Sequence, residues 1–112
     1  MKSRLKAAKK EQTKATRLIY DRFRERFPNL SDDINKVVYE YLPRSVRLRI
    51  IDEAFAGKSY AERELIVEEV LDALPEDVAS SVSLMLLLTP REAKRPGVGM
   101  ELEFDDPTGE HM

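Results

Sequence analysis

The sequence predicts a small α+β domain, and three stretches of the chain carry this prediction. Residues 45–52 alternate apolar and polar side chains with the period of two that is typical of a half-buried strand. Residues 59–74 repeat apolar side chains with the period of a helix that buries one face. Residues 82–88 form a short, nearly continuous apolar run, as expected for a strand buried on both faces. A chain of 112 residues suits one such domain.

A first amphipathic helix is predicted ahead of these stretches. Four apolar residues recur at helical spacing before Pro28 ends the segment: Leu18, Ile19, Phe23 and Phe27. Preceding residues, 1–17, are mostly Lys, Ala, Glu, Gln and Thr, which favour a helix but supply little apolar surface. We therefore expect a basic helical arm over 1–17 and a domain over 18–93.

The C-terminal residues 94–112 have a different composition. They combine Pro and Gly with several acidic residues, which is typical of a flexible acidic tail. Within this tail, residues 99–104 are a candidate edge strand.

The helix over 59–74 has the most complete local signals. Gly57 supplies the permissive backbone that a strand-to-helix turn needs, and Ser59 with Glu62 forms the S-x-x-E pattern of a capping box. Pro75 follows the helix, whose predicted buried stripe is Ile66, Val67, Val70, Leu71 and Leu74.

Two segments can be interpreted either as helix or as strand. Residues 31–42 match an apolar helical stripe after a Ser31 cap, but their β-branched and aromatic side chains also suit a strand. Residues 75–88 can form a helix that begins at Pro75, or a connection followed by the strand 82–88. If both segments are helices, the domain is all-α, which is the alternative fold class.

One sequence motif resembles the BolA-like family of stress-associated adaptor proteins. It is Phe55-x-Gly57-Lys58-Ser59, followed by Arg63 and an apolar-rich helix. A second match is Leu88-Thr89-Pro90-Arg91-Glu92, and together the resemblance covers about residues 18–93. It implies an α-β-β-α-β arrangement similar to a class II KH domain. It places the first strand over Lys36–Tyr41, and on this basis we choose the strand for that segment.

The resemblance also implies a partner and a metal cluster. BolA-like proteins typically bind monothiol glutaredoxins, and the pair shares an iron-sulfur cluster to which the BolA-like member contributes His or Cys. Here the loop between the first strands is Leu42-Pro43-Arg44-Ser45, the position after Arg63 is Glu64, and the start of the third strand is Ser80-Ser81-Val82. These side chains are poor ligands for such iron. We therefore expect an adaptor that has no cofactor or metal of its own and binds its partner through Gly57, Lys58, Ser59, Arg63 and Glu64.

The sequence offers little for catalysis, and we expect no enzyme. The chain has no Cys, its single histidine is His111, and Glu68 and Glu69 are helix neighbours that point apart. Gly57-Lys58-Ser59 resembles the end of a phosphate-binding loop, but that motif requires a glycine where this chain has Asp52.

Charge is distributed unevenly along the chain. Residues 1–26 hold ten Lys or Arg against three Asp or Glu, which gives +7, so the net charge of −2 leaves −9 for the remainder. A basic arm on an acidic domain can bind nucleic acid, although a solvated helix face has the same composition. The Gly-x-x-Gly loop with which KH domains clamp nucleic acid is missing. A nucleic-acid-binding regulator is therefore the alternative function, with the candidate residues Lys6, Lys9, Lys10, Lys14, Arg17, Arg47 and Arg49.

No membrane association is expected from the apolar residues. The longest apolar run, residues 82–88, is far shorter than the roughly 20 residues of a membrane helix. The N-terminus lacks the apolar core of a secretory signal. We therefore expect a cytoplasmic protein.

Overall fold

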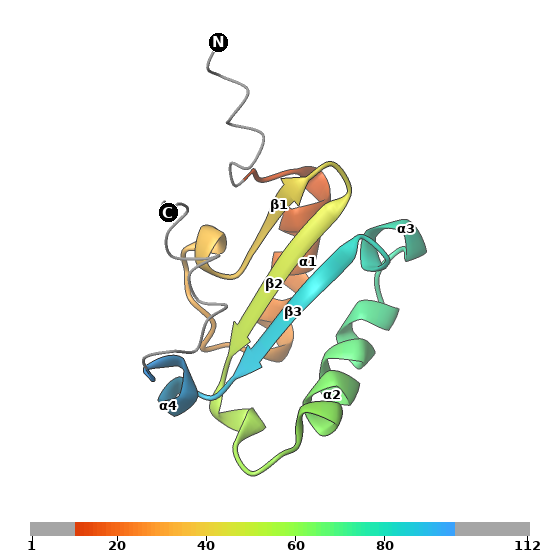
Figure 1. Ribbon diagram of the computed structural model, residues 1–112. Helices are drawn as coiled ribbons and strands as arrows, with labels where there is room; N and C mark the ends of the chain where they lie inside the picture. The colour runs from red at the N-terminus through yellow and green to blue at the C-terminus, as the bar shows by residue number, and fades with distance from the viewer. Residues whose placement is uncertain (1–10, 96–112) are drawn as a thin grey trace.

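The computed structural model describes residues 11–95, which form a three-stranded mixed sheet with helices packed against it (Figure 1). In chain order the elements are α1 (Lys14–Arg26), η2 (Ile34–Lys36), β1 (Val38–Leu42), β2 (Ser45–Ile51), η3 (Glu53–Phe55), α2 (Tyr60–Asp72), α3 (Glu76–Ala79), β3 (Val82–Leu88) and α4 (Pro90–Ala93). The predicted α+β class is confirmed, and the all-α alternative is wrong.

The sheet has the order β1-β2-β3. Strands β1 and β2 are antiparallel and joined by a tight turn, whereas β2 and β3 are parallel. A parallel pair needs a crossover connection, because the chain must return to the starting end of the first strand. Here α2 and α3 form that crossover, which fixes α2 beside β3.

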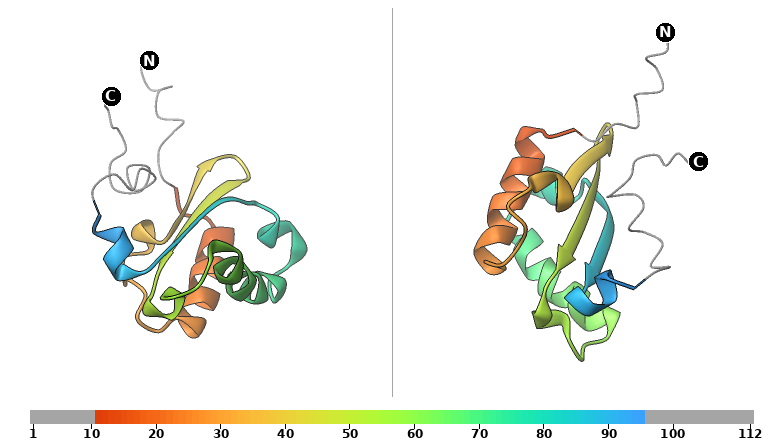
Figure 2. Two further views of the ribbon diagram at one scale, coloured as in Figure 1. Left: turned by 60° about the horizontal axis from the view of Figure 1, so that its bottom comes forward. Right: turned by 90° about the vertical axis from the view of Figure 1, so that its left-hand side faces the viewer.

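The hydrophobic core lies between one face of the sheet and the helices (Figure 2). Helix α1 contributes Ile19 and Phe23 and α2 contributes Val67, all of them fully buried. The sheet supplies Leu48 and Ile50, which are two residues apart on β2 and therefore point to the same face. The predicted apolar stripes of both helices are thus confirmed as core-facing.

The two ambiguous segments each contain a short helical turn followed by a strand. Asp33 accepts a hydrogen bond from the Asn35 amide and starts the single turn η2, after which β1 pairs with β2. Pro75 precedes the single turn α3, and β3 follows over the predicted range 82–88. Pairing with β2 satisfies the backbone groups of both strands, which outweighs the helical periodicity of residues 31–42.

Helix α1 begins earlier than the predicted boundary at residue 18. Thr13 caps it, and Thr13 and Thr16 form a reciprocal capping box. Just before the cap, Glu11 pairs with Glu40 of β1 through two backbone hydrogen bonds of 2.9 and 3.1 Å. Residues 11–17 are therefore part of the domain. Residues 1–10 of the predicted arm and 96–112 of the predicted tail, including the candidate strand 99–104, lie outside the described residues.

The turn between β1 and β2 contains a strained residue. Arg44 has φ 63°, a left-handed conformation that costs an L-residue with a Cβ atom roughly 1–2 kcal/mol. Pro43 precedes it, and the Arg44 amide donates a hydrogen bond of 2.9 Å to a carboxylate oxygen of Glu40. This bond involves the backbone of Arg44, so it does not depend on the identity of the side chain.

Replacing Arg44 by glycine should relieve this strain. We expect R44G to be about 1 kcal/mol more stable than R44A, because both variants keep the bond to Glu40 and only alanine retains the left-handed penalty. Urea unfolding of the two variants measures the difference. An R44A variant as stable as R44G would contradict the strain.

Candidate functional site

The connection from β2 to α2 is built as the sequence predicts. Gly57 has φ +76°, and a Cβ atom added there would meet nothing within 4 Å, so the backbone conformation and not lack of space selects glycine. Ser59 caps α2 by accepting a hydrogen bond from the Glu62 amide, and the Glu62 carboxylate accepts one from the Ser59 amide. The predicted capping box is confirmed.

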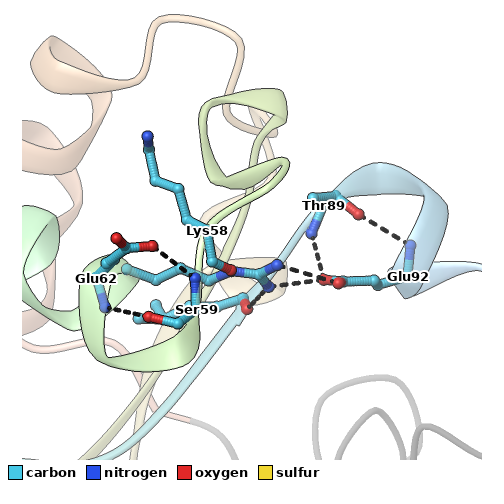
Figure 3. A network of polar contacts seen from close by, with 7 residues as sticks. Lys58, Ser59, Glu62, Thr89 and Glu92 are labelled. Atoms are coloured by element: carbon cyan, nitrogen blue, oxygen red, sulfur yellow. Dashed lines mark hydrogen bonds and ion pairs between the residues drawn. The ribbon is translucent and has the colours of Figure 1, made fainter.

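Arg63 lies inside the domain and joins three segments. Figure 3 shows the polar network to which these contacts belong, with Lys58 and Ser59 on one side and Thr89 and Glu92 on the other. Its guanidinium donates to the Lys58 carbonyl at 3.0 Å and to the Leu87 carbonyl at 2.9 Å. It also binds both carboxylate oxygens of Glu92, at 2.7 and 3.1 Å. The same group lies 5.8 Å from the centre of the Phe55 ring, within range of a cation–π contact. Arg63 is only 8% exposed, and its guanidinium makes these contacts within the domain rather than on an open surface.

Glu92 is held from two sides and belongs to the short helix α4. Its side chain accepts a hydrogen bond from the Thr89 amide at 2.9 Å, and its own amide donates to the Thr89 hydroxyl. The Arg63 guanidinium, together with the Thr89 backbone bond, lowers the pKa of Glu92 from its usual 4.5 to about 2. Sequence reasoning missed this helix, although Thr89-Pro90-Arg91-Glu92 is a second capping-box pattern with proline at the first helical position.

Helix α2 also closes the free edge of β3. The Leu88 carbonyl accepts from the Asp52 amide on the β2 side, so the neighbouring Leu87 carbonyl points to the outer edge. Arg63 donates a hydrogen bond to that carbonyl, and the Tyr60 hydroxyl donates one to the Met85 carbonyl at 2.6 Å. Two acceptors of an exposed strand edge are thereby satisfied within the chain.

The outward side of α2 carries a surface of one leucine among acidic groups. Leu65 is 64% exposed, the largest value among the big apolar side chains of the described residues. The residues three and four positions away on the helix lie beside it and are also exposed. We call this group the α2 surface: Ala61, Glu62, Leu65, Glu68 and Glu69.

The predicted partner-binding residues differ in their exposure to solvent. Gly57, Lys58 and Ser59 are exposed at the N-terminal end of α2, and Glu64 is half-buried on its first turns. Arg63 is turned inward, as described. The sequence pattern did not single out Leu65, because one apolar residue outside the buried stripe has no periodic signal.

The predicted nucleic-acid residues are likewise separated. Lys14 and Arg17 are exposed on the first turns of α1. Arg47 is half-buried with its guanidinium 3.8 Å from the centre of the Tyr41 ring. Arg49 is only 6% exposed and donates to the Lys36 carbonyl at 3.3 Å, so its predicted place on a solvent face is wrong. Lys6, Lys9 and Lys10 lie outside the described residues.

The two long helices carry opposite charge. Helix α1 holds five Lys or Arg against two acidic residues, whereas α2 holds five acidic residues against the inward Arg63. Both helices pack on the same face of the sheet. The surface of this side therefore changes from basic to acidic across the molecule.

The positions that a BolA-like protein would use for cluster ligands do not fit iron. Arg44 and Ser81 border an open hollow of about 530 Å³ together with Glu40 and Asp77, and Glu64 is not part of its lining. A guanidinium, a hydroxyl and one carboxylate do not replace His or Cys at an iron-sulfur cluster. Within residues 11–95 no three His, Cys, Asp or Glu side chains come together as a candidate metal site.

No helix among residues 11–95 has the length and apolar character needed to cross a membrane. Comparison of the chain with protein-family models, curated proteins and solved structures finds no match.

Replacing Glu92 by glutamine should remove part of the acid sensitivity of the fold. With a folded-state pKa of about 2 against 4.5, the carboxylate stabilises the fold fully above pH 4.5, and this stabilisation is lost as the pH falls towards 2. Urea unfolding at several pH values should show a steeper loss of stability for the wild type than for E92Q in this window.

The matched control is E69Q, which removes an exposed carboxylate of α2 and should keep the wild-type steepness. Equal steepness in the wild type and E92Q would contradict the assigned role of Glu92.

Proposed function

We propose that this protein is a non-enzymatic BolA-like adaptor that binds a protein partner through the α2 surface. The observation that carries the proposal is the exposure of Leu65, an apolar side chain in the middle of an acidic helix face. Exposed apolar side chains within a polar rim are typical of protein-binding sites. Lys58 at the turn before α2 adds a cation beside this surface.

The order of the long elements supports the BolA-like part of the proposal. Helix α1, strands β1 and β2, helix α2 and strand β3 follow one another as helix, strand, strand, helix, strand. The BolA-like resemblance implies this order, and the turn over Gly57–Ser59 that carries the resemblance leads directly to the proposed binding helix.

The proposed partner is a monothiol glutaredoxin, the class of protein that the resemblance implies. The adaptor would contribute contacts and no cluster ligands, since Arg44, Glu64 and Ser81 stand at the expected ligand positions. Binding would therefore use the partner's protein surface and leave the coordination of its iron unchanged.

Leu65→Ser should weaken binding to a cluster-loaded monothiol glutaredoxin about tenfold, which corresponds to ~1.4 kcal/mol, because an exposed apolar anchor would be lost. Titration calorimetry measures the affinity, and the visible absorption of the cluster should not change on binding.

Leu42→Ser is the matched control, since Leu42 is also an exposed leucine, at 45%, but lies on the β1–β2 hairpin. It should bind like the wild type. Equal weakening by both variants would contradict the α2 surface, and no binding by the wild type would overturn the glutaredoxin partner.

A second candidate function is nucleic-acid binding, favoured by the exposure of Lys14 and Arg17 directly after the basic N-terminal residues. Counter-ion release would drive such binding, so the affinity would fall steeply with salt.

The double variant K14E/R17E tests this second function by fluorescence anisotropy with short DNA and RNA at several salt concentrations. Its affinity and its salt dependence should both fall if the two side chains contact phosphates. The control K94E/R95E makes the same change of charge at two exposed residues near α4. Equal losses would indicate a non-specific effect of net charge and contradict a site on α1.

A further inference from the structure

The outward side of α2 and the short helix α3 carry exposed carboxylates. Between Ser59 and Pro90 the single Lys or Arg is Arg63, whose guanidinium is turned inward to Glu92. The carboxylates follow α2 from its first turn to its last residue and continue onto α3, which lies beyond the C-terminal end of α2 (Figure 1). We call this group the acidic band: Glu62, Glu68, Glu69, Asp72, Glu76 and Asp77.

Within residues 11–95, no ion pair includes a member of the acidic band. The basic helix α1 differs in this respect. Its Arg22 lies 3.6 Å from the carboxylate of Glu25, and its Arg24 lies 2.7 Å from that of Asp32. Charges on α1 are thus partly balanced by neighbours in the same chain, whereas the carboxylates on the outward side of α2 are not.

The acidic band is unfavourable for the stability of α2. Glu68 and Asp72 are four positions apart and Glu69 and Asp72 are three apart, so like charges are neighbours on the helix surface. These residues also lie in the C-terminal half of α2, where unpaired carbonyls favour cations, and the last turn contains no basic residue. Residues that break a local rule of helix stability are typical of functional sites.

Leu65 lies within the acidic band. Residues three or four positions apart are neighbours on a helix, so its exposed side chain is bordered by Glu62, Glu68 and Glu69. An apolar centre with a charged rim is the composition of a protein-binding surface. The sign of the rim selects the partner, because opposite charges attract across an interface and like charges repel.

We infer that the partner of the α2 surface presents a basic segment, with Lys or Arg side chains facing the acidic band and an apolar side chain on Leu65. This inference rests on the proposed binding through the α2 surface and adds the chemistry of the segment that binds there. Basic side chains would offset the repulsion between the carboxylates of α2, and an acidic segment would increase it.

Two synthetic peptides of equal length test the inference on the ¹⁵N-labelled full-length chain. Both carry leucine at helical spacing, and the remaining positions are lysine in one peptide and glutamate in the other. The lysine peptide should shift the amide signals of Ala61, Leu65 and Glu69 and leave those of Lys14 and Arg17 on α1 unchanged. No shifts with the lysine peptide, or equal shifts with the glutamate peptide, would overturn the inference.

Charge reversal on α2 separates a local contact from attraction by net charge. The variant E68K/E69K should weaken binding of the lysine peptide at least about tenfold. It should also unfold at a higher urea concentration than the wild type, because the like-charge neighbours are removed. The matched control D21K/E25K makes the same change of net charge at two exposed residues of α1 and should bind nearly as the wild type does. Equal weakening by both variants would overturn the inference.

Two further measurements test the apolar contact and the identity of the occupant. L65S should weaken binding of the lysine peptide about tenfold, and an unchanged affinity would overturn the contact on Leu65. Without peptide, the α2 signals should not depend on protein concentration. Concentration-dependent shifts would show that the basic helix α1 of a second copy is the occupant and would overturn a separate partner.

Cluster-loaded monothiol glutaredoxin distinguishes this inference from the proposed function. E68K/E69K should lower the affinity for glutaredoxin, and D21K/E25K should not. Glutaredoxin binding that E68K/E69K leaves unchanged would overturn the basic segment and leave the proposed function in place. Binding of the lysine peptide without binding of glutaredoxin would support the basic segment and overturn the proposed partner.

Discussion

The Arg63 guanidinium is the interaction on which the rest of the structure depends. It binds the Lys58 carbonyl in the turn before α2, the Leu87 carbonyl at the free edge of β3 and the Glu92 carboxylate of α4. One side chain of the crossover helix α2 is thus hydrogen-bonded to the strand that follows the crossover. A charge this deeply buried is tolerated only when it is paired and fully hydrogen-bonded. Its acceptors come from residues 58, 87 and 92, so it ties α2 to the turn before it, to β3 and to α4.

Backbone groups on both edges of the sheet are bound by other segments of the chain. At β1 the backbone of Glu11 pairs with Glu40, and the Gln12 side chain donates to the Val38 carbonyl at 2.7 Å. At β3 the side chains of Tyr60 and Arg63 donate hydrogen bonds to the backbone carbonyls of Met85 and Leu87. Addition of a partner strand is therefore blocked at these positions.

Local patterns predicted most of the fold. The Ser59 cap, the alternation over residues 45–52 and the apolar run over 82–88 each depend on near neighbours, and each is present in the structure. The strand β1 could not be chosen from periodicity, because its stability comes from pairing with β2.

Side-chain placement was less predictable than the backbone, since it depends on distant residues. Arg63 appears exposed in the helix pattern, but Glu92 binds it from 29 residues away. Arg49 occupies the polar position of an alternating strand, yet it is only 6% exposed. Nothing in the local pattern of either arginine reveals its partner. The Thr89 capping box could have been recognised, and with it the acidic residue that Arg63 needs.

The opposite charges of α1 and α2 contribute an electric dipole moment to the described region, residues 11–95. Two helices side by side, one basic and one acidic, present the two signs at separate places on the surface while the net charge of the chain is only −2. Such a particle turns in the field of a charged surface before it touches it. Near a polyanion it would approach with α1 first, so that orientation, and not only affinity, would decide which side is free to meet a second molecule.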